Sequence, residues 1–141
     1  MSFEYYTNVY AEDVDHGGIV YHANYLRYAE RCRSEWLNYL GFSLRKCMEE
    51  HIYFVVKTAN IEYVKPAFLS DTLAVGCEIK KISKTSIQMK QFVWRTQAQD
   101  PRITQDRELL AKMDLTLVHI NQLFKPTTIP TQIVEAIKND N

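Results

Sequence analysis

The hydrophobic residues of this chain change their period once, from about 3.6 residues to two, and that change limits the folds open to it. Over residues 23–40 apolar side chains recur every three or four positions, which predicts one long helix with a face to be covered. After residue 53 the spacing is two, in four successive runs with no helical pattern between them. Parallel strands need helical crossovers, so we expect an α+β architecture with a mainly antiparallel sheet and the long helix on one face. The helical stripe consists of Tyr25, Leu26, Ala29, Cys32, Trp36, Leu37 and Leu40, and the runs are residues 54–65, 72–82, 86–96 and 109–120.

Three shorter segments complete the expected fold. Residues 3–11 are rich in aromatic and β-branched side chains and predict a fifth strand. Residues 43–50 predict a short helix with Ser43 as its N-cap, and residues 131–139 predict a terminal helix. We therefore expect five strands and three helices of unequal length.

The composition excludes several classes of protein. Lys plus Arg and Asp plus Glu number 17 each, so the net charge of zero argues against a nucleic-acid or membrane-surface partner. The three cysteines form no Cys-x-x-Cys pair, which argues against a disulfide framework or a zinc ribbon. The N-terminus lacks the basic and apolar regions of a signal peptide, and no stretch approaches the roughly 18 apolar residues of a membrane span. We expect one cytoplasmic, reduced domain over residues 1–141.

The stretch EDVDHGGIVYHANYL, residues 12–26, gathers polar and flexible residues immediately before the long helix. Its glycine pair permits a tight turn and a close approach of backbone to a ligand. The first N–H groups of a helix lack intrahelical acceptors, so one of them could stabilise an oxyanion. A carboxylate on the loop could act as a general base or as a nucleophile. This combination suits acyl transfer without Ser or Cys, and the equally open alternative is that Asp13 or Asp15 only caps the turn.

Other chemistries fit the same stretch poorly. Asp13 and Asp15 are spaced like the start of a calcium loop, but Asn24 stands where that loop needs a bidentate Glu. His16 and His22 lack the i, i+4 spacing of a zinc-binding pair, so we expect no metal site. The sequence also has no Gly-x-Ser-x-Gly elbow and no phosphate-binding glycine motif.

The segment EDVDHGGIVYHANYLRYAERCRSEWL resembles the signature of the YbgC-like acyl-CoA thioesterases, in the 4-hydroxybenzoyl-CoA thioesterase branch of the hotdog-fold superfamily. The similarity continues through FVVKTANIEYVKPAFLSDTL and FKPTTIP and covers about residues 3–137. It implies a hotdog fold, in which a long central helix is wrapped by a mainly antiparallel five-stranded sheet. It also implies hydrolysis of an acyl-CoA thioester to free acid and CoA, with no cofactor, because coenzyme A is part of the substrate.

The resemblance also implies roles for single residues. The catalytic Asp of the family corresponds to Asp15, acting as base or nucleophile. The oxyanion donor of the family, a backbone N–H at the helix start, corresponds to His22, whose side chain also matches a position near the thioester. Glu12 and Asp13 match acids that support the turn. The residues expected to bind substrate around this centre are Tyr21, Asn24 and Tyr25.

A second candidate site is the KKISKTS segment, residues 80–86, which resembles the CoA-binding hairpin of the family. Lys84 is the strongest candidate for a phosphate contact, and Lys125 is a weaker one for the same nucleotide. The alternative is an ordinary solvated hairpin, for which lysine is a common residue. The possible hydrogen-bond donors of this hairpin are Ser83, Thr85 and Ser86.

Two classes of function follow from this resemblance. The first is an acyl-CoA thioesterase, and the second is a non-catalytic acyl-group-binding or scaffold dimer, because hotdog domains host several activities. The expected partners are acyl-CoA and further copies of the chain, as a dimer or a dimer of dimers (homotetramer). The family further implies an association with the Tol–Pal envelope system and contacts with lipid-synthesis proteins or acyl carrier protein. No nucleic-acid partner and no transmembrane segment are expected.

Overall fold

The computed structural model describes residues 2–100, 102–103 and 106–140, and its core is a five-stranded sheet. Every neighbouring pair of strands is antiparallel, in the order β1-β3-β4-β5-β2. This arrangement confirms the expected α+β hotdog architecture. The strands are β1 (Ser2–Asn8), β2 (Tyr53–Tyr63), β3 (Thr72–Ile82), β4 (Ser86–Arg95) and β5 (Glu108–Ile120), and the helices are α1 (Asn24–Tyr39), α2 (Leu44–Glu49) and α3 (Thr131–Asn139).

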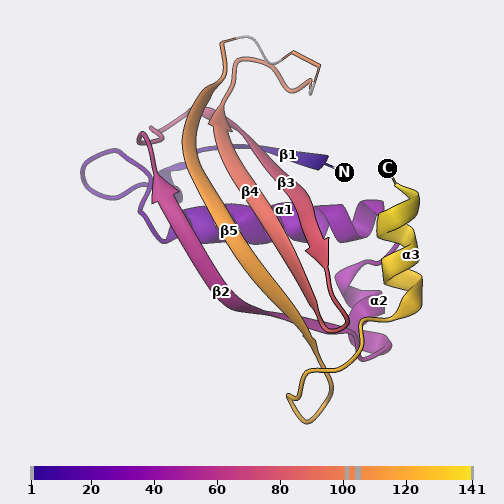
Figure 1. The fold of residues 1–141 in the computed structure, drawn as a ribbon. Coiled ribbons are helices and arrows are strands. Elements are labelled where there is room, and N and C mark those ends of the chain that lie inside the picture. The colour runs from indigo at the N-terminus through magenta and orange to yellow at the C-terminus, as the bar shows by residue number, and fades with distance from the viewer. Residues whose placement is uncertain (1, 101, 104–105, 141) are drawn as a thin grey trace.

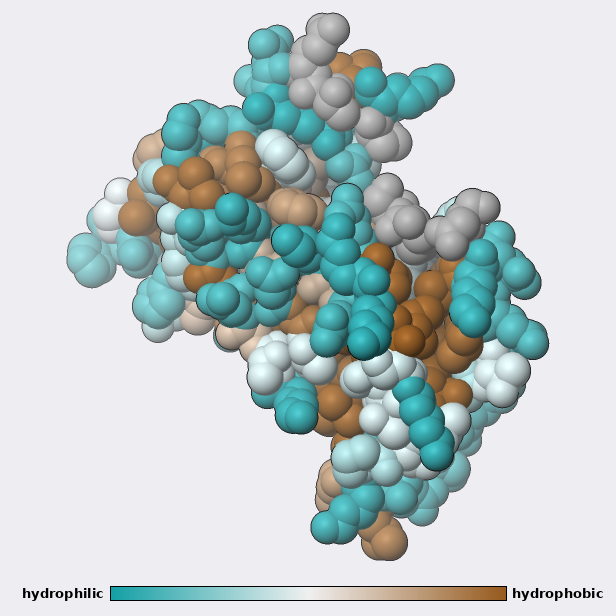
Figure 2. All heavy atoms as spheres, in the orientation of Figure 1, coloured by the Kyte–Doolittle hydropathy of each residue, from teal (hydrophilic) through white to brown (hydrophobic). Residues whose placement is uncertain are grey.

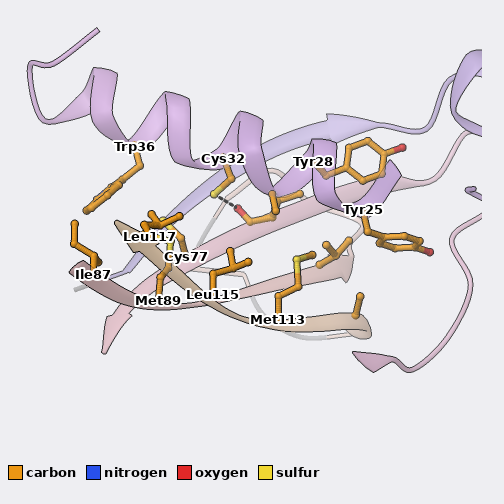
Figure 3. Close-up of a cluster of buried hydrophobic side chains, with 14 of the residues drawn as sticks. Tyr25, Tyr28, Cys32, Trp36, Cys77, Ile87, Met89, Met113, Leu115 and Leu117 are labelled. Atoms are coloured by element: carbon orange, nitrogen blue, oxygen red, sulfur yellow. Dashed lines mark hydrogen bonds between the residues drawn. The ribbon is translucent and has the colours of Figure 1, made fainter. Parts of the chain in front are cut away.

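The long helix α1 crosses one face of the sheet, and the strands curve around it (Figure 1). Its buried side chains point at the sheet, where Trp36 and Cys32 meet apolar residues from the three central strands (Figure 3). Each large side chain fully buried in this way contributes about 1.5–3 kcal/mol to folding. The strand residues of this layer include Cys77, Ile87, Met89, Met113, Leu115 and Leu117.

The helix boundaries follow from local signals in the sequence. Gly41, at φ 96°, adopts the left-handed conformation after α1, and the N–H of Phe42 bonds the carbonyl of Leu37 at 2.8 Å. Ser43 Oγ accepts the N–H of Lys46 at 3.2 Å, as expected for the N-cap of α2.

Two details of the sequence prediction are wrong. Leu26 was expected to widen the buried stripe of α1, but it is 41% exposed. The first strand was expected over residues 3–11, but β1 ends at Asn8. The chain then enters a 3-10 turn, Ala11–Asp13, in which the Asp13 carboxylate accepts the N–H of Tyr10.

A polar bridge crosses the core beneath α1. Gln91 on β4 is completely buried, and its side-chain amide donates to the carbonyl of Ala29 at 3.0 Å. Its Oε1 accepts Nη1 of Arg33 at 2.8 Å, and burial lowers the pKa of that guanidinium. The bridge therefore satisfies a half-buried charge with a neutral partner.

Replacing Gln91 with alanine should destabilise the fold. The substitution leaves an Arg33 donor unpaired, and an unsatisfied partly buried polar group costs about 1–3 kcal/mol. We expect a loss of free energy of unfolding in that range in urea titrations followed by circular dichroism. Lys90→Ala, whose side chain lies on the outer face of β4, is the matched control, with a change below about 0.5 kcal/mol. Equal stability of the two variants would contradict this role for the bridge.

The strand β2 is an open edge of the sheet, because it pairs only with β5. Most of its middle is exposed, including the apolar side chains of Val55 (42%) and Val56 (46%). An exposed apolar edge strand carries unpaired backbone groups that favour pairing with another strand.

Among the described residues, none of the helices has the length and hydrophobicity of a membrane span.

Candidate active site

The acidic stretch before α1 folds into a short hairpin. The backbone of residue 14 pairs with that of residue 20, the N–H of Asp15 bonds the carbonyl of Ile19 at 3.0 Å, and the N–H of Tyr21 bonds the carbonyl of Asp13 at 3.0 Å. Two backbone bonds from this hairpin, and two more from Val9 just before it, attach this part of the chain to residues 67–71, immediately before β3. These four bonds are Val9 N–H to Asp71 O, Ser70 N–H to Val9 O, Leu69 N–H to Gly18 O and Val20 N–H to Ala67 O.

Asp13 holds this hairpin together. It is only 5% exposed, and each of its carboxylate oxygens accepts a hydrogen bond: Oδ2 from the N–H of Tyr10 at 2.9 Å, and Oδ1 from Nδ2 of Asn24 at 3.0 Å. Asn24 is itself buried, so the structure places it as the partner of Asp13 at the first turn of α1. Asp13 therefore uses both of its carboxylate oxygens to cap this turn and to bind the first turn of α1.

Asp15 differs from Asp13 in both exposure and bonding. It is exposed, and its Oδ1 accepts the N–H of Gly17 at 2.9 Å. Within the described part of the chain, Oδ2 accepts no hydrogen bond. A Cβ at position 17 would lie 3.3 Å from Oδ1, and Gly18 has φ 78°, so both glycines allow the turn that presents this carboxylate. One oxygen of Asp15 is thus fixed and the other faces solvent.

His22 lies where the chain enters α1. Its carbonyl accepts the Tyr63 hydroxyl at 2.8 Å, and its ring lies between those of Tyr21, at 4.6 Å, and Tyr63, at 6.4 Å. Its backbone N–H has no acceptor among residues 2–100, 102–103 and 106–140. An unpaired N–H at a helix start carries partial positive charge, so this group can stabilise negative charge on a ligand oxygen.

The tyrosines around His22 have different surroundings. Tyr21 is 52% exposed, whereas Tyr25 is 3% exposed and its hydroxyl accepts the N–H of Ala67 at 3.1 Å. Burial raises the pKa of Tyr25, which keeps its hydroxyl neutral. Tyr63, at the end of β2, lines a shallow groove with His22 and Tyr25. Sequence reasoning missed Tyr63, because only the fold brings the end of β2 to the start of α1.

The candidate CoA-binding residues lie at the opposite end of the sheet (Figure 1). The hairpin of residues 83–86 follows β3, whose length corresponds to about 33 Å, whereas the Asp15 turn lies at the start of that strand. Lys84 is exposed, and its carbonyl accepts the N–H of Ile129 at 2.9 Å. Lys125 lies in the adjacent turn after β5. Within one subunit these five residues lie together at one end of the sheet, whereas Asp15 lies at the other end. They are Ser83, Lys84, Thr85, Ser86 and Lys125.

An apolar cavity of about 130 Å³ lies at the same end as the hairpin. It is formed between α1, α2 and the first half of β2, and Arg33 and Glu30 are its charged residues. A cavity of this size is comparable with one that holds a benzene molecule. Its apolar lining includes Trp36, Leu37, Leu44, Phe54, Val56, Ile87, Leu117 and Ile133.

Comparison with known proteins gives consistent matches. A family model described as "Thioesterase superfamily" matches residues 17–101. The chain is 34% identical to the acyl-CoA thioester hydrolase YbgC of Escherichia coli O157:H7 over 137 residues, 96% of each protein. It is 42% identical to the acyl-CoA thioesterase YbgC of Haemophilus influenzae over 94 residues, 66% of this chain and 69% of that protein. The fold matches a 1,4-dihydroxy-2-naphthoyl-CoA thioesterase from Synechocystis with TM-score 0.86 at 23% identity, over 100% of this chain and 99% of the other.

Proposed function

Because this chain belongs to the thioesterase superfamily, we propose that it hydrolyses acyl-CoA with Asp15 as the catalytic carboxylate and the backbone N–H of His22 as the oxyanion donor. The activity as an acyl-CoA thioesterase follows from the family match and from the YbgC relatives. The observation that carries the assignment of residues is the pair of unpaired groups on one short hairpin, Oδ2 of Asp15 and the N–H of His22, among the described residues.

These two groups have the chemistry that thioester hydrolysis needs. The carboxylate oxygen attacks the thioester carbon or removes a proton from an attacking water. Negative charge then develops on the carbonyl oxygen, where the N–H of His22 stabilises it. When water attacks, cleavage of the carbon–sulfur bond gives the free acid directly, and the proton taken from water passes to the CoA thiolate. When Asp15 attacks, cleavage leaves the acyl group on Asp15 as a mixed anhydride, and a water then hydrolyses it to the free acid, restores the Asp15 carboxylate and supplies the proton for the thiolate. The Tyr63 hydroxyl, bonded to the carbonyl of His22, holds the helix entrance in place.

The proposed active site is completed by a second subunit. The end of β2 contacts His22 through Tyr63. The start of β2 lies near the Lys84 hairpin, because Phe54 pairs with His119 on β5 and the N–H of His119 bonds the carbonyl of Thr85. If two β2 edges pair antiparallel about a two-fold axis, the start of each meets the end of the other. The Lys84 hairpin and the apolar cavity of one subunit then lie beside the Asp15 turn of its partner. The expected tetramer, cytoplasmic location and envelope or lipid-synthesis partners stay predictions.

A panel of acyl-CoAs tests the proposed reaction. Short, long and aromatic thioesters should release free thiol in the presence of the purified protein, detected with a thiol-reactive dye. We expect hydrolysis of at least part of the panel at rates that scale with enzyme concentration. Binding of acyl-CoA without thiol release from any member would favour the non-catalytic acyl-binding dimer instead.

Replacing Lys84 with alanine should raise KM by only a few-fold and leave kcat nearly unchanged. An exposed lysine meets CoA phosphates as a point charge, and such a contact is worth about 0.2–1 kcal/mol. Because it lies far from the thioester, it binds ground and transition states equally. The effect should shrink at high salt.

An acyl-pantetheine substrate without the nucleotide is the control for Lys84→Ala. The variant and the wild type should hydrolyse it with the same KM. An equal loss on both substrates would mean that Lys84 supports the fold or the acyl pocket. No loss on either would make the hairpin an ordinary solvated turn.

A further inference from the structure

The turn after β5 presents two apolar side chains to solvent. Leu123 is 77% exposed and Phe124 is 80% exposed. The turn is nevertheless well bonded: the N–H of Asn121 bonds the carbonyl of Lys125 at 2.9 Å, and the N–H of Phe124 bonds the carbonyl of Asn121 at 2.9 Å. In Figure 1 it projects beyond the end of the sheet, and in Figure 2 hydrophobic side chains mark the same lower tip. A fixed turn thus exposes two large apolar groups at this end of the subunit, where Phe124 also borders a shallow groove formed with α2 and the start of β2.

Phe124 also adopts an unfavourable backbone conformation. Its φ of 61° lies in the left-handed region, which favours glycine or asparagine and disfavours a bulky side chain. Outliers of this kind occur where a side chain serves a contact or function outside its own segment.

A second apolar patch lies at the other end of β2, beside the acidic hairpin that carries Asp15. It contains Ile19 (36% exposed), Phe68 (48%) and Leu69 (50%), and the backbones of Ile19 and Phe68 pair in a β-bridge. The carbonyl of Ile19 accepts the N–H of Asp15, so this patch supports the catalytic turn directly. Figure 2 shows hydrophobic side chains gathered on the left of the molecule, at the end of β2 and away from the lower tip.

The two patches lie beyond opposite ends of β2. Tyr53, the first residue of β2, lies opposite Ile120, and Phe124 follows four residues further along the chain. Phe68 follows five residues after Tyr63, the last residue of β2. Antiparallel pairing of two β2 edges aligns the start of one strand with the end of the other. The turn of each subunit then reaches past the end of the partner's β2 toward the partner's patch.

We propose that Leu123 and Phe124 of one subunit pack on the Ile19–Phe68 patch of the partner subunit and hold the partner's Asp15 turn in place. The proposal rests on the edge pairing given under the proposed function. It makes the turn after β5 a positioning element for the neighbouring active site rather than part of its own. Phe124 touches no reacting atom in this arrangement, since it acts through Ile19 and the backbone of Asp15.

Site-directed cross-linking tests the contact without any assay of activity. The double variant Phe68→Cys, Phe124→Cys should form a covalent dimer with a short bis-maleimide, since the three native cysteines are buried. Phe124→Cys combined with Tyr39→Cys is the control, because Tyr39 is 62% exposed but contacts Phe3 on β1, at the other edge of the sheet. Covalent dimers from the first pair alone support the proposal. Equal yields from the two pairs, or none from the first, would overturn it.

Phe124→Gly gives a second test with effects of opposite sign. Glycine relieves the left-handed strain, so the stability of the isolated subunit should stay the same or rise. The dissociation constant of the dimer should rise about tenfold. The kcat of the remaining dimer should fall about threefold to tenfold, as expected for loss of a supporting contact. Tyr39→Ala should change neither property. Wild-type dimer strength and kcat in Phe124→Gly would overturn the proposal.

Failure of this inference differs from failure of the proposed function. If the wild-type protein releases no thiol from acyl-CoA, the proposed reaction fails, while cross-linking still decides the contact. If the wild type is active but Phe124→Gly matches it in kcat and dimer strength, the reaction stands and the contact is wrong. Cross-linking of the first pair only at concentrations where sedimentation shows larger aggregates would also count against the dimer contact.

Discussion

Replacing Asp15 with asparagine is expected to lower kcat by about 10²-fold or more while the fold survives, since general bases and nucleophiles contribute at least that much. The carboxamide can still accept the N–H of Gly17 through its oxygen, so the turn keeps its shape. It cannot accept a proton or attack the thioester. Thiol release under saturating acyl-CoA gives kcat, and circular dichroism checks the fold.

Asp13→Asn is the matched control for this prediction. Asp13 accepts two hydrogen bonds in a buried position, and an amide can accept through only one of its two groups. The control should therefore lose about 1–3 kcal/mol of stability, with a smaller effect on kcat than Asp15→Asn. If Asp15→Asn hydrolyses acyl-CoA at the wild-type rate, the proposed mechanism is wrong.

Ala59→Asp should convert the protein to a folded monomer with little activity. Ala59 is exposed near the middle of β2, so two-fold pairing would bring the two new carboxylates close together. Like charges across paired strands are destabilising. Because the Lys84 hairpin and Asp15 lie at opposite ends of one subunit, the monomer should lose at least about tenfold in kcat/KM. Sedimentation at micromolar concentration gives the oligomeric state.

Thr116→Asp adds the same charge one strand away from the edge. Thr116 lies on β5, where it pairs with Thr58 of β2, so β2 separates it from the partner strand. This control should stay dimeric and active. A wild-type protein that sediments as an active monomer at micromolar concentration would be incompatible with an active site shared between subunits.

The sequence predicted the helices and strands better than it predicted which strands pair with each other. The period of α1 and the alternation in β3, β4 and β5 are local signals, so their existence and approximate bounds could be read directly. The order β1-β3-β4-β5-β2 depends on pairings between distant segments, which a local pattern does not encode. The exposure of Leu26 shows the same limit, because an apolar residue at a stripe position of the helix is not covered by the sheet.

The candidate site could be predicted in part for the same reason. A carboxylate beside a helix start is a local feature, and the hairpin before α1 has it. Spacing alone did not separate Asp13 from Asp15, since the difference is the buried bond between Asp13 and Asn24. Tyr63 was missed because it is distant in sequence from His22. The large distance between Asp15 and Lys84 also follows from the fold and not from any motif, because the two residues lie at opposite ends of β3.

The attachment of the acidic hairpin to residues 67–71 has a consequence for how substrate enters. Two backbone hydrogen bonds and a β-bridge tie this hairpin to residues 67–69, and Val9 makes two more bonds to residues 70–71, so the Asp15 turn cannot swing away without breaking the entry to β3. Amide hydrogens at Val9 and Val20 should accordingly exchange with solvent as slowly as those of the strands. The protein presents a preformed carboxylate, and any opening and closing around acyl-CoA has to be carried out by other parts of the protein.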